Sequence, residues 1–163
     1  MDIIIIGYSG FIGKNIFNFL VSNETYSLTG ISSKEIDLTK DNSFIPLSKY
    51  LSSDCIVIMC SGIKKQLGDN FKAYEGNTSI INNFCQAVSL VPPKKIIFLS
   101  SASVYGEDVT YLKKITEQTP VQLKSYYGIS KYSAERILSK VCTDNQIELT
   151  ILRPPLVYGK DDT

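Results

Sequence analysis

Three glycines within the first thirteen residues constrain the fold of this chain more than any other feature. The segment Gly7-Tyr-Ser-Gly10-Phe-Ile-Gly13 directly follows an apolar run, Ile3 to Ile6, and precedes a stretch with helical spacing of apolar residues. A continuous β-branched run is typical of a strand buried on both faces of a parallel sheet. Glycines between such a strand and a helix let backbone N–H groups approach a pyrophosphate, toward which the helix also points its positive end. The pattern therefore predicts a strand–turn–helix that binds a dinucleotide.

The expected contacts of this turn include its glycines and the first residues of the helix. They are Gly7, Ser9, Gly10, Phe11, Ile12 and Gly13.

Short apolar runs alternate with amphipathic stretches along the rest of the chain. Strands are expected at 3–6, 27–31, 55–59, 95–99 and 149–152, and helices at 11–21, 78–88 and 127–141. Parallel strands joined through helices require crossover connections, which place helices on the sheet faces. The sequence thus predicts an α/β fold of Rossmann type, with a doubly wound parallel sheet, helices on both faces and one domain over 1–163.

Composition excludes several classes of function. Seventeen Lys and Arg against sixteen Asp and Glu give a net charge of +1, without the basic surface that nucleic acids or anionic membranes require. The absence of histidine excludes His-based triads and most zinc sites. Four dispersed cysteines without a CxxC pair predict free thiols in a reducing compartment. We expect a cytoplasmic protein with no metal, nucleic-acid or membrane partner.

A second group of residues has the types that hydride-transfer chemistry needs. The chain reads Leu-Ser-Ser-Ala-Ser-Val-Tyr-Gly over 99–106, and a YxxxK pattern runs from Tyr127 to Lys131. Residues four apart on a helix share one face, so the ammonium of Lys131 can lower the pKa of Tyr127 from about 10 toward working pH. Tyr127 can then exchange a proton with a carbinol, while a strand-end serine hydrogen-bonds the same oxygen.

The order and spacing of these motifs resemble the extended short-chain dehydrogenases/reductases over essentially the whole chain. The resemblance is to the NAD-dependent epimerase/dehydratase family, whose members are similar to UDP-galactose 4-epimerase. It implies a Rossmann-type cofactor domain with Ser101, Tyr127 and Lys131 as catalytic residues. It also implies that Tyr127 and Lys131 contact the cofactor, with Lys131 holding the nicotinamide ribose.

Further positions match the same family. An acidic-apolar pair receives the adenine ring, a turn with a following lysine contacts the cofactor, and an asparagine near a helix start approaches it. The segment Arg153-Pro-Pro-Leu-Val-Tyr-Gly159 resembles the family's RPxxVYG signature beside the nicotinamide. The residues that this resemblance adds to the cofactor site are Asp37, Leu38, Cys60, Ser61, Gly62, Lys64, Asn77 and Pro154.

The residues after the second strand bear on the choice between NAD and NADP. An acid at that strand end holds the ribose hydroxyls, whereas hydroxyl or basic side chains accept a 2′-phosphate. Here the strand is followed by Ser32, Ser33 and Lys34, and no acid occurs before Glu35. The pattern favours NADP over NAD.

Two departures from the family refine the expected chemistry. Ala102 and Ser103 stand where dTDP-glucose 4,6-dehydratases have an Asp-Glu pair, which argues against dehydratase chemistry. Family members also run to roughly twice this length, as expected of two-lobed enzymes. We therefore expect the C-terminal substrate-binding lobe to be absent from this chain, which alone would bind cofactor only.

The resemblance implies a nucleotide-sugar epimerase or 4-keto-sugar reductase, with a nucleotide sugar as the partner of the full-length parent. A short-chain dehydrogenase/reductase for a non-sugar carbonyl is an alternative, and a non-catalytic NAD(P)-binding regulatory module is another. The family also implies a homodimer through the helix after Thr78 and the helix that carries Tyr127.

Overall fold

Strands and helices alternate along the chain in the computed structural model, which describes residues 1–22, 25–106 and 114–159. The strands are β1 (Asp2–Ile6), β2 (Ser27–Ile31), β3 (Ile56–Met59), β4 (Lys95–Leu99) and β5 (Glu148–Leu152). The α-helices are α1 (Phe11–Val21), α2 (Phe44–Ser48), α3 (Phe71–Leu90) and α4 (Tyr126–Asp144), and two short 3-10 helices are η1 (Lys65–Leu67) and η2 (Ala102–Tyr105).

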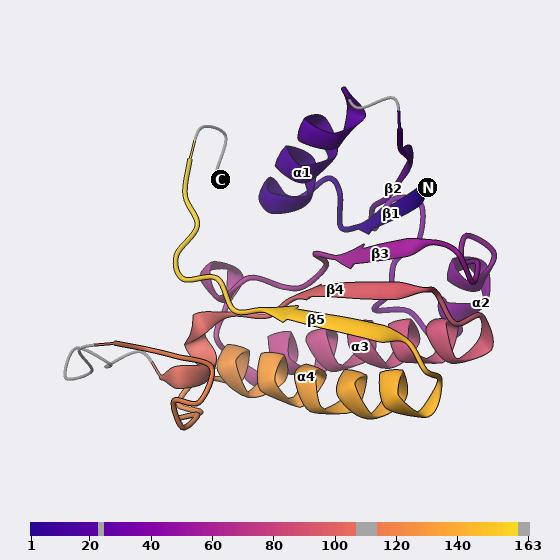
Figure 1. The fold of residues 1–163 in the computed structure, drawn as a ribbon. Helices are drawn as coiled ribbons and strands as arrows, with labels where there is room; N and C mark the ends of the chain where they lie inside the picture. The colour runs from indigo at the N-terminus through magenta and orange to yellow at the C-terminus, as the bar shows by residue number, and fades with distance from the viewer. Residues whose placement is uncertain (23–24, 107–113, 160–163) are drawn as a thin grey trace.

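The described strands form one parallel sheet in the order β2-β1-β3-β4-β5 (Figure 1). Ile4 of β1 lies opposite Thr29 of β2 on one side and Val57 of β3 on the other. The chain therefore winds outward from β1 in both directions. In such sheets the crevice at the carboxyl ends of the two strands where the order reverses is where ligands bind. Here that switch point lies between β1 and β3.

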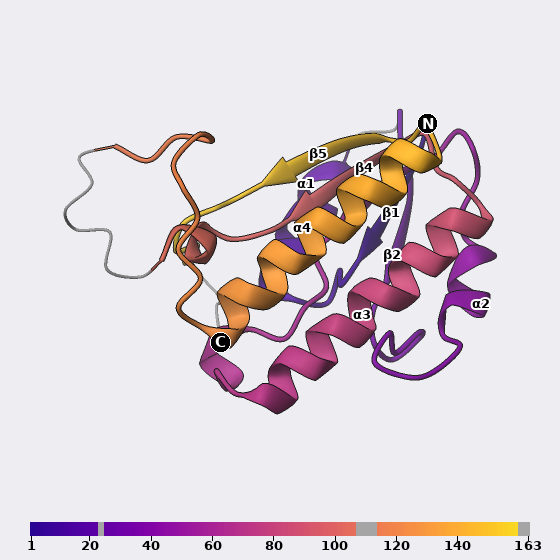
Figure 2. The same cartoon turned by 90° about the horizontal axis from the view of Figure 1, so that it is seen from below.

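Helices cover both faces of the sheet, so the predicted doubly wound α/β fold of Rossmann type is confirmed. One face is covered by α1, whose Ile12 and Ile16 pack with Ile3 and Ile5 of β1. The other face is covered by α2, α3 and α4, of which α3 and α4 run side by side in Figure 2. Ile4 belongs to the core on this second side. Alternate isoleucines of β1 thus enter opposite layers, which explains the continuous apolar run.

Side-chain caps fix the starts of the two long helices. The Asn70 side chain accepts a hydrogen bond from Ala73 N at 3.0 Å, and α3 begins at Phe71, seven residues before the predicted start. The Ser125 side chain accepts one from Gly128 N at 3.0 Å at the start of α4. Within the described ranges, no helix is long and apolar enough to cross a membrane.

Candidate active site

A cleft of about 540 Å³ opens at the carboxyl ends of β1, β3 and β4. We call it the main cleft. Its lining combines the glycine turn, the loops after β3 and β4, one face of α4 and the segment after β5. The sequence-predicted residues that line it are Gly7, Gly10, Phe11, Ile12, Gly13, Cys60, Gly62, Lys64, Ser101, Tyr127, Lys131 and Pro154. The structure therefore brings together motifs that lie up to 147 residues apart, from position 7 to position 154.

Packing explains two of the three glycines in the turn. Gly7 has a φ of +83°, and a Cβ there would lie 2.8 Å from Ser61 N. A Cβ on Gly13 would lie 2.3 Å from Gly7 O. At Gly10 the nearest atom to such a Cβ is Gly7 O at 3.4 Å, an ordinary contact. Gly10 faces the main cleft, so the absence of a side chain there leaves room for a bound group. Packing within the fold does not require it.

The start of α1 suits an anion. Gly10 is its N-cap and makes no side-chain capping hydrogen bond, and the first helical bond of the cap is from Lys14 N to Gly10 O. The N–H groups of the first helical turn have no intrahelical acceptor, and the helix dipole adds partial positive charge at this end. The residues present therefore fit the pyrophosphate of a dinucleotide.

A second cleft of about 200 Å³ adjoins the main cleft on the β2 side. We call it the adenine-side cleft. It is lined by the predicted residues Ser32, Ser33, Asp37, Leu38 and Ser61. Gly7 and Gly62 line both clefts, so the two adjoin at the switch point.

Hydrogen bonds shape the wall of the adenine-side cleft. The Asp37 carboxylate accepts hydrogen bonds from Thr39 N at 3.0 Å and Thr39 Oγ1 at 2.7 Å, which lower the pKa of Asp37. The amide of Asn83 on α3 donates to Leu38 O at 3.0 Å and to Lys40 O at 3.1 Å. Asn83 was not predicted from the sequence. Its position between Ile80 and Phe84, on the apolar side of α3, is the signal that could have identified it.

The side chain of Glu35 contacts Ser32, the residue that follows β2. Its carboxylate accepts hydrogen bonds from Ser32 N at 2.8 Å and from the Ser32 hydroxyl, and both lower the pKa of Glu35. Ser32 Oγ also accepts from Lys34 N at 3.2 Å. A negative charge therefore lies beside the serine that the sequence assigned to phosphate binding.

The three predicted catalytic side chains converge on the main cleft. The Ser101 hydroxyl donates to Ser103 Oγ and accepts from Ser103 N, both at 3.1 Å. Lys131 Nζ donates to Leu99 O at 2.8 Å and lies 5.8 Å from the ring centroid of Tyr127. Ser101 and Tyr127 share a hydrogen bond. The lining of the main cleft thus includes the phenol of Tyr127, the hydroxyl of Ser101 and the buried ammonium of Lys131.

The pKa values in the trio correct one sequence-based expectation. Burial raises the pKa of Tyr127, and the hydrogen bond with Ser101 opposes that rise, whereas a lowering by Lys131 was expected. The ammonium instead donates to the backbone carbonyl of Leu99. Burial also lowers the pKa of Lys131 itself to about 8, against the opposing charges of Cys60 and Glu135.

Three predicted cofactor residues are not among the described residues that line the two clefts, namely Ser9, Lys34 and Asn77. Ser9 and Lys34 are exposed. The Asn77 amide accepts from Ile63 N at 2.8 Å and donates to Ile63 O at 3.2 Å. Asn77 therefore fixes the loop that carries Gly62 and Lys64 beside the clefts.

Asp69 is another residue that sequence reasoning missed. Its Oδ1 accepts a hydrogen bond from Tyr127 N at 3.0 Å, across 58 positions of sequence. This N–H belongs to the first turn of α4, where intrahelical acceptors are lacking. Asp69 therefore supports the turn that presents Tyr127 to the cleft, and nothing in the local sequence pattern identifies it.

Comparison with known proteins agrees with this arrangement. The chain is 26% identical over 173 residues to UDP-glucose 4-epimerase of Vibrio cholerae, a match over 97% of this chain and 52% of that protein. It is 25% identical over 173 residues to N-acetyl-alpha-D-glucosaminyl-diphospho-ditrans,octacis-undecaprenol 4-epimerase of Escherichia coli O157:H7, with 98% and 50% covered. The chain thus spans about half the length of these curated relatives.

A solved structure shows the same fold. The crystal structure of UDP-glucuronic acid 4-epimerase from Bacillus cereus in complex with NAD superposes with a TM-score of 0.79 at 25% identity, covering 98% of this chain and 57% of that one. The sequence model of the NAD dependent epimerase/dehydratase family matches residues 3–163. With the glycine turn, the YxxxK pair and the parallel sheet all in place, this chain belongs to the NAD dependent epimerase/dehydratase family.

Proposed function

We propose that the complete protein is a nucleotide-sugar 4-epimerase or 4-keto-sugar reductase, and that its sugar-binding lobe is supplied by sequence outside these 163 residues. One observation carries the proposal: Ser101, Tyr127 and Lys131 line the same cleft as Gly10 at the phosphate-binding turn. The names of two relatives described above support the substrate class, because UDP-glucose 4-epimerase of Vibrio cholerae and UDP-glucuronic acid 4-epimerase of Bacillus cereus are both named for nucleotide sugars.

The side chains divide the chemistry among them. A nicotinamide cofactor, when bound, accepts or supplies the hydride. Tyr127 removes a proton from the sugar hydroxyl or returns one to the carbonyl oxygen, and Ser101 donates a hydrogen bond to that oxygen. Lys131, as an ammonium, holds the ribose of the cofactor. This role needs a charged lysine, so the reaction should slow as pH rises through about 8, the pKa of Lys131.

Replacing the general acid/base tests the proposed function. Tyr127→Phe in the complete protein should lower kcat by at least roughly 100-fold, the lower range for losing such a group. Turnover is measured on a panel of UDP-, GDP- and dTDP-linked sugars, and NADH fluorescence titration serves as the control for an intact cofactor site. Near-normal turnover in the variant would refute the assignment. A wild type that binds cofactor but turns over only non-sugar carbonyls would favour the alternative substrate class.

For the cofactor we propose NAD, a change from the NADP preference that the sequence favours. The N–H and hydroxyl of Ser32 already bond the Glu35 carboxylate, whose lowered pKa keeps it ionised at neutral pH. A carboxylate at the end of β2 suits ribose hydroxyls and repels a 2′-phosphate.

Parallel fluorescence titrations of the chain with NADH and NADPH test this choice. NADH should bind more tightly to the wild type, and Glu35→Gln should shift the ratio of affinities toward NADPH by roughly tenfold because it removes the like charge. Glu148→Gln, an exposed carboxylate at the far end of β5, is the matched control. Tighter NADPH binding by the wild type would contradict the proposal and support the prediction from Ser32, Ser33 and Lys34.

A further inference from the structure

A buried carboxylate on α4 lies one helical turn beyond Lys131. Tyr127, Lys131 and Glu135 follow at four-residue spacing, so the three share one side of the helix. The first two line the main cleft, whereas Glu135 is not among the described residues of that lining. Its side chain is only 3% exposed. A carboxylate is seldom buried this deeply unless it is paired.

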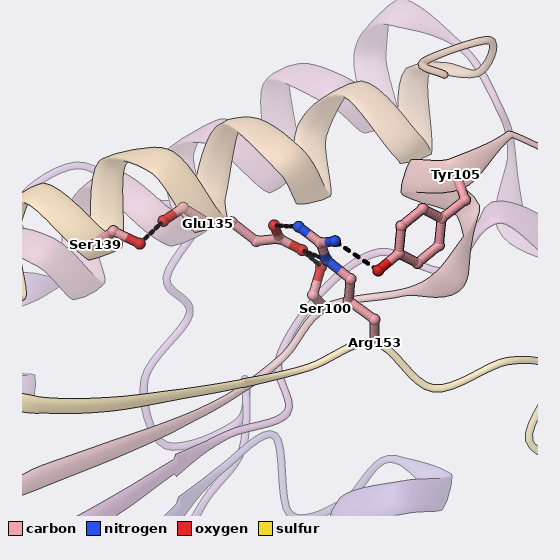
Figure 3. A network of polar contacts seen from close by, with 5 residues as sticks. All are labelled: Ser100, Tyr105, Glu135, Ser139 and Arg153. Carbon is pink, nitrogen blue, oxygen red and sulfur yellow. Dashed lines mark hydrogen bonds and ion pairs between the residues drawn. The ribbon is translucent and has the colours of Figure 1, made fainter. Parts of the chain in front are cut away.

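Arg153 supplies the partner charge (Figure 3). Its Nε donates to Glu135 Oε1 at 2.9 Å and its Nη2 to Oε2 at 2.6 Å, a two-pronged contact. The carboxylate also accepts from the Ser100 hydroxyl. On its other side, Arg153 Nη1 donates to the Tyr105 hydroxyl at 2.7 Å, and the guanidinium lies 5.0 Å from the centroid of that ring. Parallel charge-assisted hydrogen bonds of this kind fix both partners in orientation.

Each partner lies beside a part of the main cleft. Ser100 directly precedes Ser101, and Arg153 directly precedes Pro154. Backbone hydrogen bonds also join the segment after β4 to the end of β5 and the residues that follow it. Ser100 N donates to Leu152 O at 2.8 Å, and Ala102 N donates to Pro154 O at 2.9 Å. One carboxylate on α4 is therefore joined to the end of β4 and to the segment after β5.

We propose that Glu135 and Arg153 form a buried positioning pair, which holds the ends of β4 and β5 against α4 and so fixes the three catalytic side chains relative to one another. The inference rests on the proposed function, since it assigns the pair to the same reaction. Both residues act through their neighbours, and neither takes part in proton or hydride transfer.

The pair also sets the charge around Lys131. Burial lowers the pKa of that lysine, whereas the charge of the Glu135 carboxylate favours its protonated form. The other titratable groups facing it are the phenol of Tyr127 and the thiol of Cys60, whose pKa burial raises to about 11. Without the Glu135 carboxylate, the positive charge of Arg153 is no longer neutralised. Both consequences lower the pKa of Lys131 further, so the ammonium loses its proton at a lower pH.

Glu135→Gln in the complete protein tests the proposal. With saturating cofactor, kcat should fall by at least roughly tenfold while the KM for the sugar nucleotide changes by less than about threefold. The alkaline limb of the pH–rate profile should move down by about one pH unit, a change that a purely structural role does not produce. Glu148→Gln removes the exposed ion pair with Lys95, of 2.5 Å, and should leave both readouts at wild-type values.

A folded Glu135→Gln variant with wild-type kcat and an unmoved alkaline limb overturns the proposal. If circular dichroism shows that this variant does not fold, Glu135→Gln with Arg153→Gln removes the unpaired charge, and wild-type kcat in that double variant overturns it equally. A wild type that turns over no sugar nucleotide refutes the proposed function instead. The pH dependence of NADH binding then still tests the pair, since Glu135→Gln should weaken binding at lower pH than in the wild type.

Discussion

The glycine turn illustrates how single residues divide between folding and binding. A Cβ on Gly13 would lie 2.3 Å from a backbone oxygen, whereas one on Gly10 would make an ordinary contact and face the main cleft. Gly13→Ala should therefore lower the free energy of unfolding by about 1–3 kcal/mol, as overpacking does. Gly10→Ala should change it by less than about 1 kcal/mol, yet weaken NADH binding at least tenfold, about 1.4 kcal/mol.

Urea unfolding and NADH titration of the two variants separate these effects. Equal loss of stability in both would show that Gly10 also serves packing. Unchanged NADH affinity in a folded Gly10→Ala variant would count against the turn as the phosphate site.

The sequence predicted which residues meet at the site, but it did not predict the surroundings of each side chain. The positions of Ser101, Tyr127 and Lys131 on one cleft follow from motif spacing and the fold. The environment of each does not. Burial lowers the pKa of Lys131, and its ammonium donates to the Leu99 carbonyl. The contact of Glu35 with Ser32 depends on a loop path that no local pattern encodes.

Among the elements, α4 is the one whose placement the site depends on most. Asp69 accepts from Tyr127 N and Ser125 caps the same turn. Asp69→Ala leaves that N–H without its acceptor, so the unfolding free energy should fall by about 1 kcal/mol and kcat should fall with it. Asp69→Asn keeps an acceptor oxygen and is the matched control in urea unfolding and turnover. Equal behaviour of the alanine and asparagine variants would contradict the capping role.

Elements were predicted where periodicity marked burial and missed where it did not. The strand at Lys95–Leu99 was predicted with its observed bounds, because four of its five residues form a continuous apolar run. The first turns of α3 lie beyond the core, which α3 enters only from Ile80, so apolar spacing began near residue 78. The five-residue α2 contains Pro46 and is too short to show a period. Its Leu47 nevertheless belongs to the core.

For the whole molecule, we propose a homodimer through α3 and α4. Their first turns carry an aromatic cluster, in which Phe71 lies 6.2 Å from Tyr126 and 5.8 Å from Tyr74 between ring centroids. Phe71 is 56% and Tyr126 42% exposed, an apolar surface of the kind that partners cover. Sedimentation should show a dimer that Phe71→Glu converts to monomer. A wild type that stays monomeric at high concentration would refute the proposal for this chain.

The strand order also bears on how the molecule is made. Each strand after β2 joins the sheet beside the one synthesised just before it, apart from β3, which takes the free edge of β1. Among the strands of the described residues, none has to insert between two that are already paired, so the sheet can grow at one edge as the chain leaves the ribosome. The glycine turn can then fold against β3 once β3 has emerged, while Tyr127 and Lys131 are still untranslated. A nascent chain can therefore complete the turn proposed to bind the cofactor phosphates before its proposed catalytic residues have been synthesised.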